Sequence, residues 1–164
     1  MAEYSHIRHT FKPIFDHNSK ILILGSLPSV KSREQGFYYG NPRNRFWLVI
    51  SEILKCDEPK TIEEKKEMLL WGQIAIWDVI SECDIKGSSD SSIRNVIPAD
   101  IGYLLKQTNI RHIFANGNTA GRLYRKYVQD KTGQEIIILP STSPANAAYS
   151  LQRLVSEWKA ILDG

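Results

Sequence analysis

This chain of 164 residues has little of several features that define large classes of protein. Its two cysteines, Cys56 and Cys83, lie far apart, which is typical of a reducing compartment and excludes a cluster held by four thiolates. No apolar run approaches the ~18 residues that a membrane-spanning helix needs. The first residues contain no apolar segment of the kind that directs secretion, so we expect a cytoplasmic protein with no membrane partner.

Metal and phosphate motifs are also lacking. No grouping of His, Cys or carboxylate side chains has metal-site spacing, so the sequence predicts no metal. There is no glycine-rich phosphate loop of the Rossmann or Walker kind, and we expect no cofactor. The net charge of +3 is compatible with nucleic acid but does not by itself indicate it.

The apolar pattern predicts a single α/β domain over residues 1–164. Short β-rich runs alternate with stretches of helical periodicity, which is typical of a parallel sheet covered by helices on both faces. The runs are residues 20–24, 73–79, 111–115 and 135–139.

Three helices are predicted from their caps. Thr61 and Glu64 have the spacing of a capping box, before a helix that Gly72 closes. Asn118 or Thr119 is expected to cap a second helix. The last helix is expected to begin at Ser143 and Pro144 and to bury an apolar stripe. That stripe comprises Ala148, Leu151, Leu154, Val155, Trp158 and Ile161.

The densest functional signal follows the first predicted strand. Residues 21–24 are an aliphatic run that predicts a buried parallel strand, and the run ends in the sequence Gly-Ser-Leu-Pro-Ser at 25–29. Residues 36–47 are rich in aromatic, amide and guanidinium groups, which suit stacking on a base and hydrogen bonding to base edges and phosphate. Because open α/β sheets bind ligands at the carboxyl ends of their strands, we expect the site here.

A second loop, at residues 141–146, follows the fourth predicted strand and should reach the same edge. The hydroxyls of Ser141, Thr142 and Ser143 either bind a phosphate together or shape the turn and cap the last helix. The polar stretch 87–92 also belongs near this edge, either as a surface loop or as part of a binding site.

Two residue types at this edge can take part in chemistry. Asp78 ends the second predicted strand and is either a catalytic carboxylate or a group that satisfies the backbone of the following loop. The amide oxygen of Asn41 or Asn44 can orient a water. Orientation is sufficient where the sugar becomes cation-like early, as it does in cleavage of an N-glycosidic bond.

Together, residues 25–29 with 39–47 and residues 139–146 resemble the two motifs of the uracil-DNA glycosylase superfamily. They are most similar to its mismatch-specific and hypoxanthine (deoxyinosine) branches. The resemblance implies a three-layer αβα sandwich with a central four-stranded parallel sheet. It also implies a monofunctional glycosylase that flips a damaged base out of the duplex and hydrolyses its glycosidic bond.

The resemblance also implies roles for individual residues. Tyr39 stacks on the flipped base, an assignment that its chemistry supports. Many members carry Asn or Asp where this chain has Leu27, so Asn44 is expected as the catalytic residue, with a structural amide as the alternative. Ser26, Leu27 and Ser141 are expected to contact the base. The residues expected to contact DNA are Ser29, Arg43, Thr142, Ser143, Ala145 and Asn146.

Two further expectations concern neighbouring side chains. Arg43 and Arg45 contact phosphate, unless one of them pairs with Asp78 inside the fold. Relatives often fill the gap left by the flipped base with a bulky side chain from the second loop. Ala145 is too small for this, so Asn146 fills the gap or insertion is shallow.

The resulting hypothesis is a monomeric enzyme that excises hypoxanthine from double-stranded DNA containing a deaminated base. Two alternatives are a glycosylase specific for uracil or thymine in G·U and G·T mismatches, and a non-catalytic module that binds damaged DNA or a nucleotide.

Overall fold

The computed structural model describes residues 3–163, and its centre is a four-stranded parallel sheet. The strand order β3-β2-β6-β7 is that of an open, doubly covered sheet, with every pair parallel. The four strands overlap the four predicted runs. Their bounds are β2 (Ile21–Gly25), β3 (Ile74–Asp78), β6 (His112–Asn116) and β7 (Ile136–Leu139).

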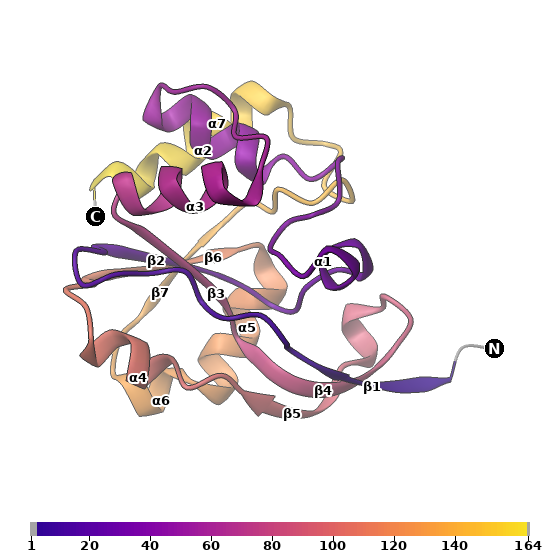
Figure 1. Cartoon of the computed structure of the whole chain (residues 1–164). Coiled ribbons are helices and arrows are strands. Elements are labelled where there is room, and N and C mark those ends of the chain that lie inside the picture. Colours follow the sequence, from indigo (N-terminus) through magenta and orange to yellow (C-terminus); the bar gives the residue numbers. More distant parts are fainter. Residues whose placement is uncertain (1–2, 164) are drawn as a thin grey trace.

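Helices cover both faces of this sheet, which confirms the predicted three-layer αβα architecture (Figure 1). Successive β2 side chains point to opposite faces, so Ile21 and Ile23 join one core while Leu22 and Leu24 join the other. The first core packs against α2 (Phe46–Leu54), α3 (Ile62–Trp71) and α7 (Leu151–Trp158), with η2 (Lys159–Asp163) following. The second packs against α4 (Ile101–Lys106) and α5 (Asn118–Tyr127), which the short α6 (Gln129–Thr132) follows.

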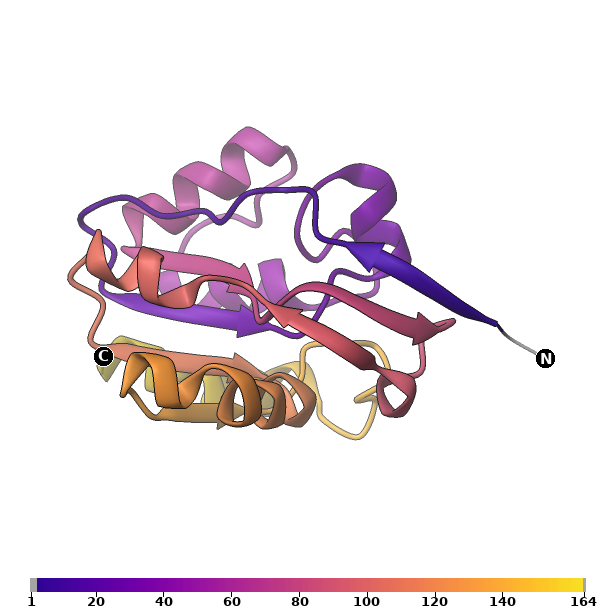
Figure 2. The same cartoon turned by 90° about the horizontal axis from the view of Figure 1, so that it is seen from below.

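A second, antiparallel sheet was not predicted from the sequence. It has the order β1-β4-β5 and comprises β1 (Tyr4–Arg8), β4 (Ile80–Lys86) and β5 (Arg94–Pro98), with η1 (Asp90–Ser92) between the last two. Figures 1 and 2 show it extending outward from the carboxyl end of the parallel sheet. Its outer strands are largely exposed and carry a weak apolar pattern, which explains why the periodicity missed them.

The capping box of α3 is confirmed. Thr61 Oγ1 accepts a hydrogen bond from the Glu64 N–H at 3.1 Å, and Glu64 Oε1 accepts one from the Thr61 N–H at 3.2 Å. Helix α5 differs from the prediction, because Gly117, at φ 95°, takes the N-cap position in place of Asn118 or Thr119.

The predicted start of the last helix at Ser143 and Pro144 is wrong. Helix α7 begins at Leu151, and Ser150 is its N-cap. The Arg45 guanidinium donates hydrogen bonds to the carbonyl oxygens of Asn146 and Tyr149. An α-helix through this segment would need those oxygens for its own N–H groups, so the residues before Ser150 form turns instead.

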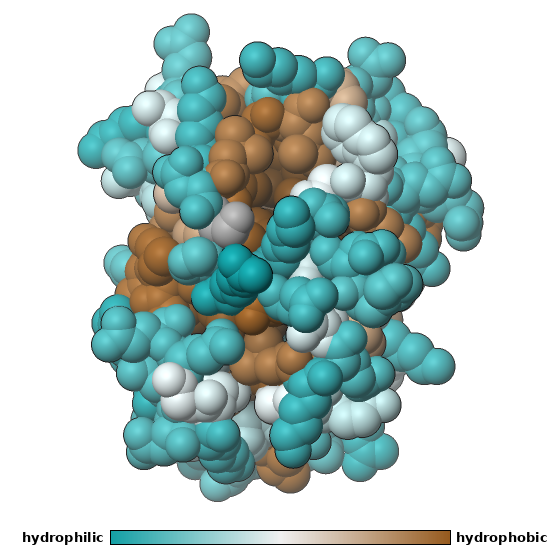
Figure 3. All heavy atoms as spheres, turned by 90° about the vertical axis from the view of Figure 1, so that its left-hand side faces the viewer, coloured by the Kyte–Doolittle hydropathy of each residue, from teal (hydrophilic) through white to brown (hydrophobic). Residues whose placement is uncertain are grey.

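The two ends of the parallel sheet differ in character. At the amino ends of the strands, apolar surface lies exposed between polar side chains (Figure 3). Trp71, the last residue of α3 before its C-cap Gly72, is 70% exposed. No helix within residues 3–163 has both the length and the apolar character required to cross a membrane. The polar loops gather at the opposite end, beyond the carboxyl ends of the strands.

Candidate active site

A cavity of about 850 Å³ opens at the carboxyl ends of the parallel strands. Its walls come from the loops that follow β2, β6 and β7, from the end of β3 and from the segment between β4 and β5. The volume is within the range of small-molecule sites. The two motif loops, far apart in the sequence, therefore meet at one edge, as the strand pattern predicts.

Most of the residues that the sequence singled out line this cavity. They are Ser26, Leu27, Ser29, Tyr39, Asn44, Ser141, Thr142, Ser143, Ala145 and Asn146, together with Asp78. Arg43 lies on the exposed surface, outside the lining. From the stretch 87–92, Gly87, Ser88 and Asp90 reach the wall, and Asp90 Oδ2 accepts a hydrogen bond from Thr119 Oγ1 at 3.1 Å.

Tyr39 forms an aromatic wall of the cavity. Its ring stacks on Phe46 with centroids 4.1 Å apart and planes at 19°. Its backbone lies in the left-handed region, with φ 52°, in the turn just before Gly40. Burial, with the nearby charge of Asp78, raises the pKa of the Tyr39 phenol, so the ring stays neutral.

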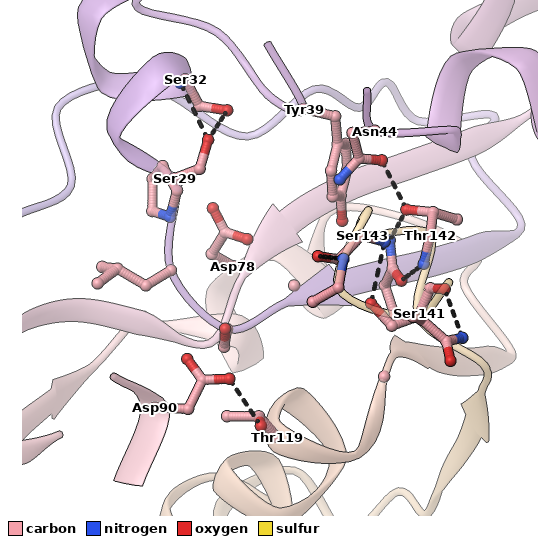
Figure 4. A pocket seen from close by; sticks show the side chains of 18 of the residues that line it. Ser29, Ser32, Tyr39, Asn44, Asp78, Asp90, Thr119, Ser141, Thr142 and Ser143 are labelled. Carbon is pink, nitrogen blue, oxygen red and sulfur yellow. Dashed lines mark hydrogen bonds between the residues drawn. The ribbon is translucent and has the colours of Figure 1, made fainter. Parts of the chain in front are cut away.

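Asn44 is held by a chain of hydrogen bonds that joins both motifs (Figure 4). Its Oδ1 accepts from the Phe46 N–H at 2.9 Å and from Thr142 Oγ1 at 2.7 Å. Thr142 Oγ1 accepts in turn from Asn116 Nδ2 at 2.9 Å. An amide oxygen has two lone pairs, and both are now engaged. The oxygen that we expected to hold a water is therefore occupied, and Nδ2 is the group left for a ligand.

Asp78 pairs with a histidine that the sequence analysis missed. His9 Nε2 lies 2.8 Å from Asp78 Oδ2, and the two side chains are only 4% and 5% exposed. The other oxygen, Oδ1, lies over Gly25, where a Cβ would come within 2.4 Å of it. His9 follows the unpredicted strand β1, so no sequence signal connected it to this site.

The alternative in which Arg43 or Arg45 pairs with Asp78 is wrong. Arg43 is exposed, and the Arg45 guanidinium binds the carbonyl oxygens of Asn146 and Tyr149. The charge of Asp78 acts instead on its tyrosine neighbours. Burial, and then the Asp78 carboxylate, raise the pKa of Tyr38 far above its ordinary value.

The hydroxyls of the second motif do not converge on one phosphate. Ser141 Oγ accepts from the Ser143 N–H at 3.1 Å, and Ser143 Oγ accepts from the Ala145 N–H at 3.2 Å, so both shape the turn. Thr142 is fully buried, and its hydroxyl is used inside the protein. This corrects the expectation that Thr142 contacts DNA. Asn146 donates to the Ser141 carbonyl at 3.0 Å.

Hydrogen bonds within the protein also hold residues 25–29 of the first motif in place. Ser29 caps the short helix α1 (Val30–Gln35) by accepting from the Ser32 N–H at 3.1 Å. The carbonyls of Gly25 and Ser26 accept from the N–H groups of Val79 and Ile80 at 2.8 and 3.1 Å. Within residues 3–163, no group of three or more His, Cys, Asp or Glu side chains is placed to hold a metal ion.

This fold, with two motif loops enclosing an aromatic, an amide and a carboxylate, defines a DNA glycosylase-like α/β protein. The profile of the Uracil DNA glycosylase superfamily matches residues 12–163, and the chain belongs to that family.

Its relatives include two proteins named hypoxanthine DNA glycosylase. The one from Methanosarcina acetivorans is 36% identical over 157 residues, covering 94% of this chain and 98% of the relative. The one from Methanosarcina barkeri is 33% identical over 150 residues, covering 90% and 93%. A solution NMR structure of a candidate uracil DNA glycosylase from Methanosarcina acetivorans superposes with a TM-score of 0.81 at 36% identity, covering 96% of each chain.

Proposed function

We propose that this protein is a monofunctional DNA glycosylase that excises hypoxanthine from deoxyinosine in double-stranded DNA. One observation carries the proposal: Tyr39 and Asn44 of the first motif and Asp78 at the end of β3 line a single cavity in a member of this superfamily. The relatives named hypoxanthine DNA glycosylase, which match at least nine-tenths of the chain, support the choice of base. The enzyme acts as a single-domain monomer in the cytoplasm.

The cavity selects the flipped base by stacking and by charge. The purine lies on the ring of Tyr39, with Ser26, Leu27 and Ser141 around its edge. The Asp78 carboxylate can only accept hydrogen bonds. Hypoxanthine offers an N–H at N1, whereas adenine has a bare acceptor there. An acceptor facing N1 therefore favours the deaminated base over the normal one.

Hydrolysis replaces the bond to the base with a bond to water. The oxygen of water adds to C1′ of the deoxyribose, while the electron pair of the C1′–N9 bond leaves with hypoxanthine. Water loses one proton, the departing base takes up one, and the products are free hypoxanthine and an abasic sugar. Negative charge develops on the base, and the N–H of Asn44 Nδ2 stabilises that charge by donating to it.

The rim of the cavity binds the DNA around the flipped nucleotide. Ser29, Ser143 and Ala145 lie along it, and the exposed Arg43 contacts backbone phosphate. Asn146 fills the gap that the base leaves, or insertion is shallow, because Ala145 is too small to fill it. Flipping costs a few kcal/mol and is least costly at a mispaired base, which adds selectivity for the lesion.

A uracil or thymine mismatch glycosylase is the second candidate. The Asp78 carboxylate is compatible with this activity as well, because uracil and thymine also present an N–H, at N3, to such an acceptor. The two activities differ in the size of base that the cavity accepts. A binding module without turnover would use the same contacts and release nothing.

Incubation of the purified protein with duplexes carrying I·T, G·U, G·T or undamaged A·T pairs, followed by alkali, tests these alternatives. We expect strand cleavage at inosine above all others and none at A·T. Preferential cleavage at G·U or G·T would establish the second candidate. Tight binding to the inosine duplex with intact strands, where a known glycosylase cuts, would overturn catalysis altogether.

A further inference from the structure

We propose that Thr142 and Asn116 are positioning residues that make Asn44 a hydrogen-bond donor in the reaction. Together they fix the side-chain amide with Oδ1 turned into the protein and Nδ2 toward the cavity. This inference rests on the proposed excision of hypoxanthine and deepens it. Thr142, which the sequence analysis expected to contact DNA, thereby influences the reaction only by orienting the Asn44 amide.

The direction of each hydrogen bond is set by groups that cannot change roles. The Thr142 N–H donates to Asn116 Oδ1 at 3.0 Å, and a backbone N–H is only a donor, so Asn116 must present Nδ2 to the Thr142 hydroxyl. That hydroxyl then has its single proton left for Asn44 Oδ1, 2.7 Å away. The Phe46 N–H also donates to Asn44 and requires an oxygen there. The bonds from Thr142 and from Phe46 therefore assign the same atom of Asn44 as Oδ1.

The sheet and the loops bring the three side chains together. Asn116 is the last residue of β6 and pairs in register with Leu139 at the end of β7, three residues before Thr142. The Arg45 N–H donates to the Thr142 carbonyl at 3.1 Å, which joins the second motif to the residue beside Asn44. Thr142 has no exposed surface, so water does not compete for these bonds.

We call the hydrogen-bonded chain Asn116–Thr142–Asn44 the relay. Its free end is Asn44 Nδ2, which lies where a donor to the base is useful. Asn44 lines the cavity beside Tyr39, and Figure 4 shows its nitrogen on the side away from Thr142. A rotated amide would place two N–H donors against the Phe46 N–H and an oxygen toward the base. The relay therefore prevents a lone pair from facing the anion that departs.

Four variants test the relay: Thr142→Val, Thr142→Ser, Asn44→Ala and the double variant Asn44→Ala/Thr142→Val. Each is assayed for single-turnover release of hypoxanthine and for affinity toward the inosine duplex. Thr108→Val is the matched control, because the Thr108 hydroxyl binds carbonyls at the end of α4, away from the cavity. Nitrogen-15 relaxation of the Asn44 Nδ2 group reports the order of the amide without any substrate.

We expect Thr142→Val to slow release by about tenfold to a hundredfold with unchanged affinity, because a misplaced donor costs rate. Thr142→Ser, which keeps the hydroxyl, restores most of the rate, and Thr108→Val matches the wild type. In the Asn44→Ala background, Thr142→Val has no further effect, because its influence passes through Asn44. The Asn44 amide becomes mobile in Thr142→Val.

Two results would overturn the relay: an equal slowing by Thr142→Val with and without Asn44, or an Asn44 amide that stays ordered in Thr142→Val. Failure of the proposed function is distinct, since it is seen as a wild-type protein that releases no hypoxanthine. In that case, mobilisation of the amide in Thr142→Val still supports the relay.

Discussion

His9 donates a hydrogen bond from Nε2 to Asp78 Oδ2 across 2.8 Å, within a part of the site that is almost closed to solvent. The bond fixes the carboxylate at the end of β3 and leaves Oδ1 over Gly25, beside the cavity. Only glycine allows this approach at position 25, because any Cβ would collide with the carboxylate. The missing side chain at Gly25 of the first motif thus makes the room that the Asp78 carboxylate occupies.

Replacement of Asp78 tests its role in recognising the base. We expect Asp78→Asn to lower the single-turnover rate on an inosine duplex by about tenfold to a hundredfold, since a hydrogen bond to a charged group is worth about 1.5–3 kcal/mol. The amide is nearly the same size, so the fold persists, which circular dichroism checks.

The exposed pair of His6 and Asp84, joined at 2.9 Å, supplies the control. Asp84→Asn makes the same chemical change on the antiparallel sheet, away from the cavity, and should leave the rate unaltered. Equal rates for wild type and Asp78→Asn would exclude the carboxylate from base recognition.

The same exposed pair gives the protein a pH-dependent contribution to stability. Hydrogen bonds to Asp84 and then Glu82 raise the pKa of His6 above 6.5. The His6 contribution is therefore complete below pH 6.5 and is lost as pH rises through the raised pKa. Hydrogen bonding to His6 lowers the pKa of Glu82 below 4.5, so that contribution is present above pH 4.5 and is lost as pH falls through the lowered pKa.

Both contributions are complete together only between these values. We expect His6→Gln to lower the melting temperature most between pH 4.5 and 6.5, and to have a diminishing effect as pH rises through the raised pKa of His6. Thermal unfolding of wild type and variant across this range measures the difference. A constant difference from acid to alkaline pH would show that the pair does not titrate as proposed.

Asn44→Asp separates a donor role from an acceptor role. The carboxylate keeps an oxygen for the Phe46 N–H and the Thr142 hydroxyl, but it replaces the Nδ2 donor with an acceptor. We expect the single-turnover rate to fall about a hundredfold or more, as it does when a donor to a developing anion is removed. Asn44→Ala should lose a similar amount.

The matched control for this change is Asn41→Asp. Asn41 lies on the same loop, and its Oδ1 accepts from the Arg43 N–H at 2.9 Å, a bond that a carboxylate keeps. We expect a rate close to that of the wild type. A faster Asn44→Asp enzyme would mean that Asn44 holds the water as an acceptor after all.

The central sheet could be predicted from sequence because its strands are largely apolar runs, and its inner strand β2 is buried on both faces. Ile21–Gly25 is buried at every position, and such a run has few alternatives in a soluble domain. Because parallel strands end at one edge, the meeting of Tyr39, Asn44 and Ser141 followed directly.

The parts that could not be predicted depend on contacts between distant segments. His9 reaches Asp78 only because β1 pairs with β4, and the exposed β1 carries little apolar signal. The segment 143–149 reads as helix by itself, but Arg45 takes its carbonyl oxygens. Of the two alternatives for the second-motif hydroxyls, the turn-shaping bonds are present: Ser141 Oγ and Ser143 Oγ accept from backbone N–H groups two residues further on, a local pattern that either alternative left open.

Stacking of the flipped base on Tyr39 predicts a difference between aromatic and aliphatic replacements. One face of the Tyr39 ring packs on Phe46, and its hydroxyl has no hydrogen-bond partner among residues 3–163. Tyr39→Phe should therefore bind damaged DNA as well as the wild type. Tyr39→Leu should bind about tenfold to a hundredfold more weakly, since stacking contributes about 1–3 kcal/mol per base.

The measurement is the dissociation constant for a duplex with 2′-fluorodeoxyinosine, whose glycosidic bond resists cleavage. Tyr103→Leu, on the exposed surface of α4, is the control for loss of an aromatic ring and should leave affinity unchanged. Both Tyr39 variants keep the left-handed backbone at φ 52°, so backbone strain does not distinguish them. Equal affinities for Tyr39→Phe and Tyr39→Leu would remove Tyr39 from the base site, and the cavity would then have to hold the purine by its edges alone.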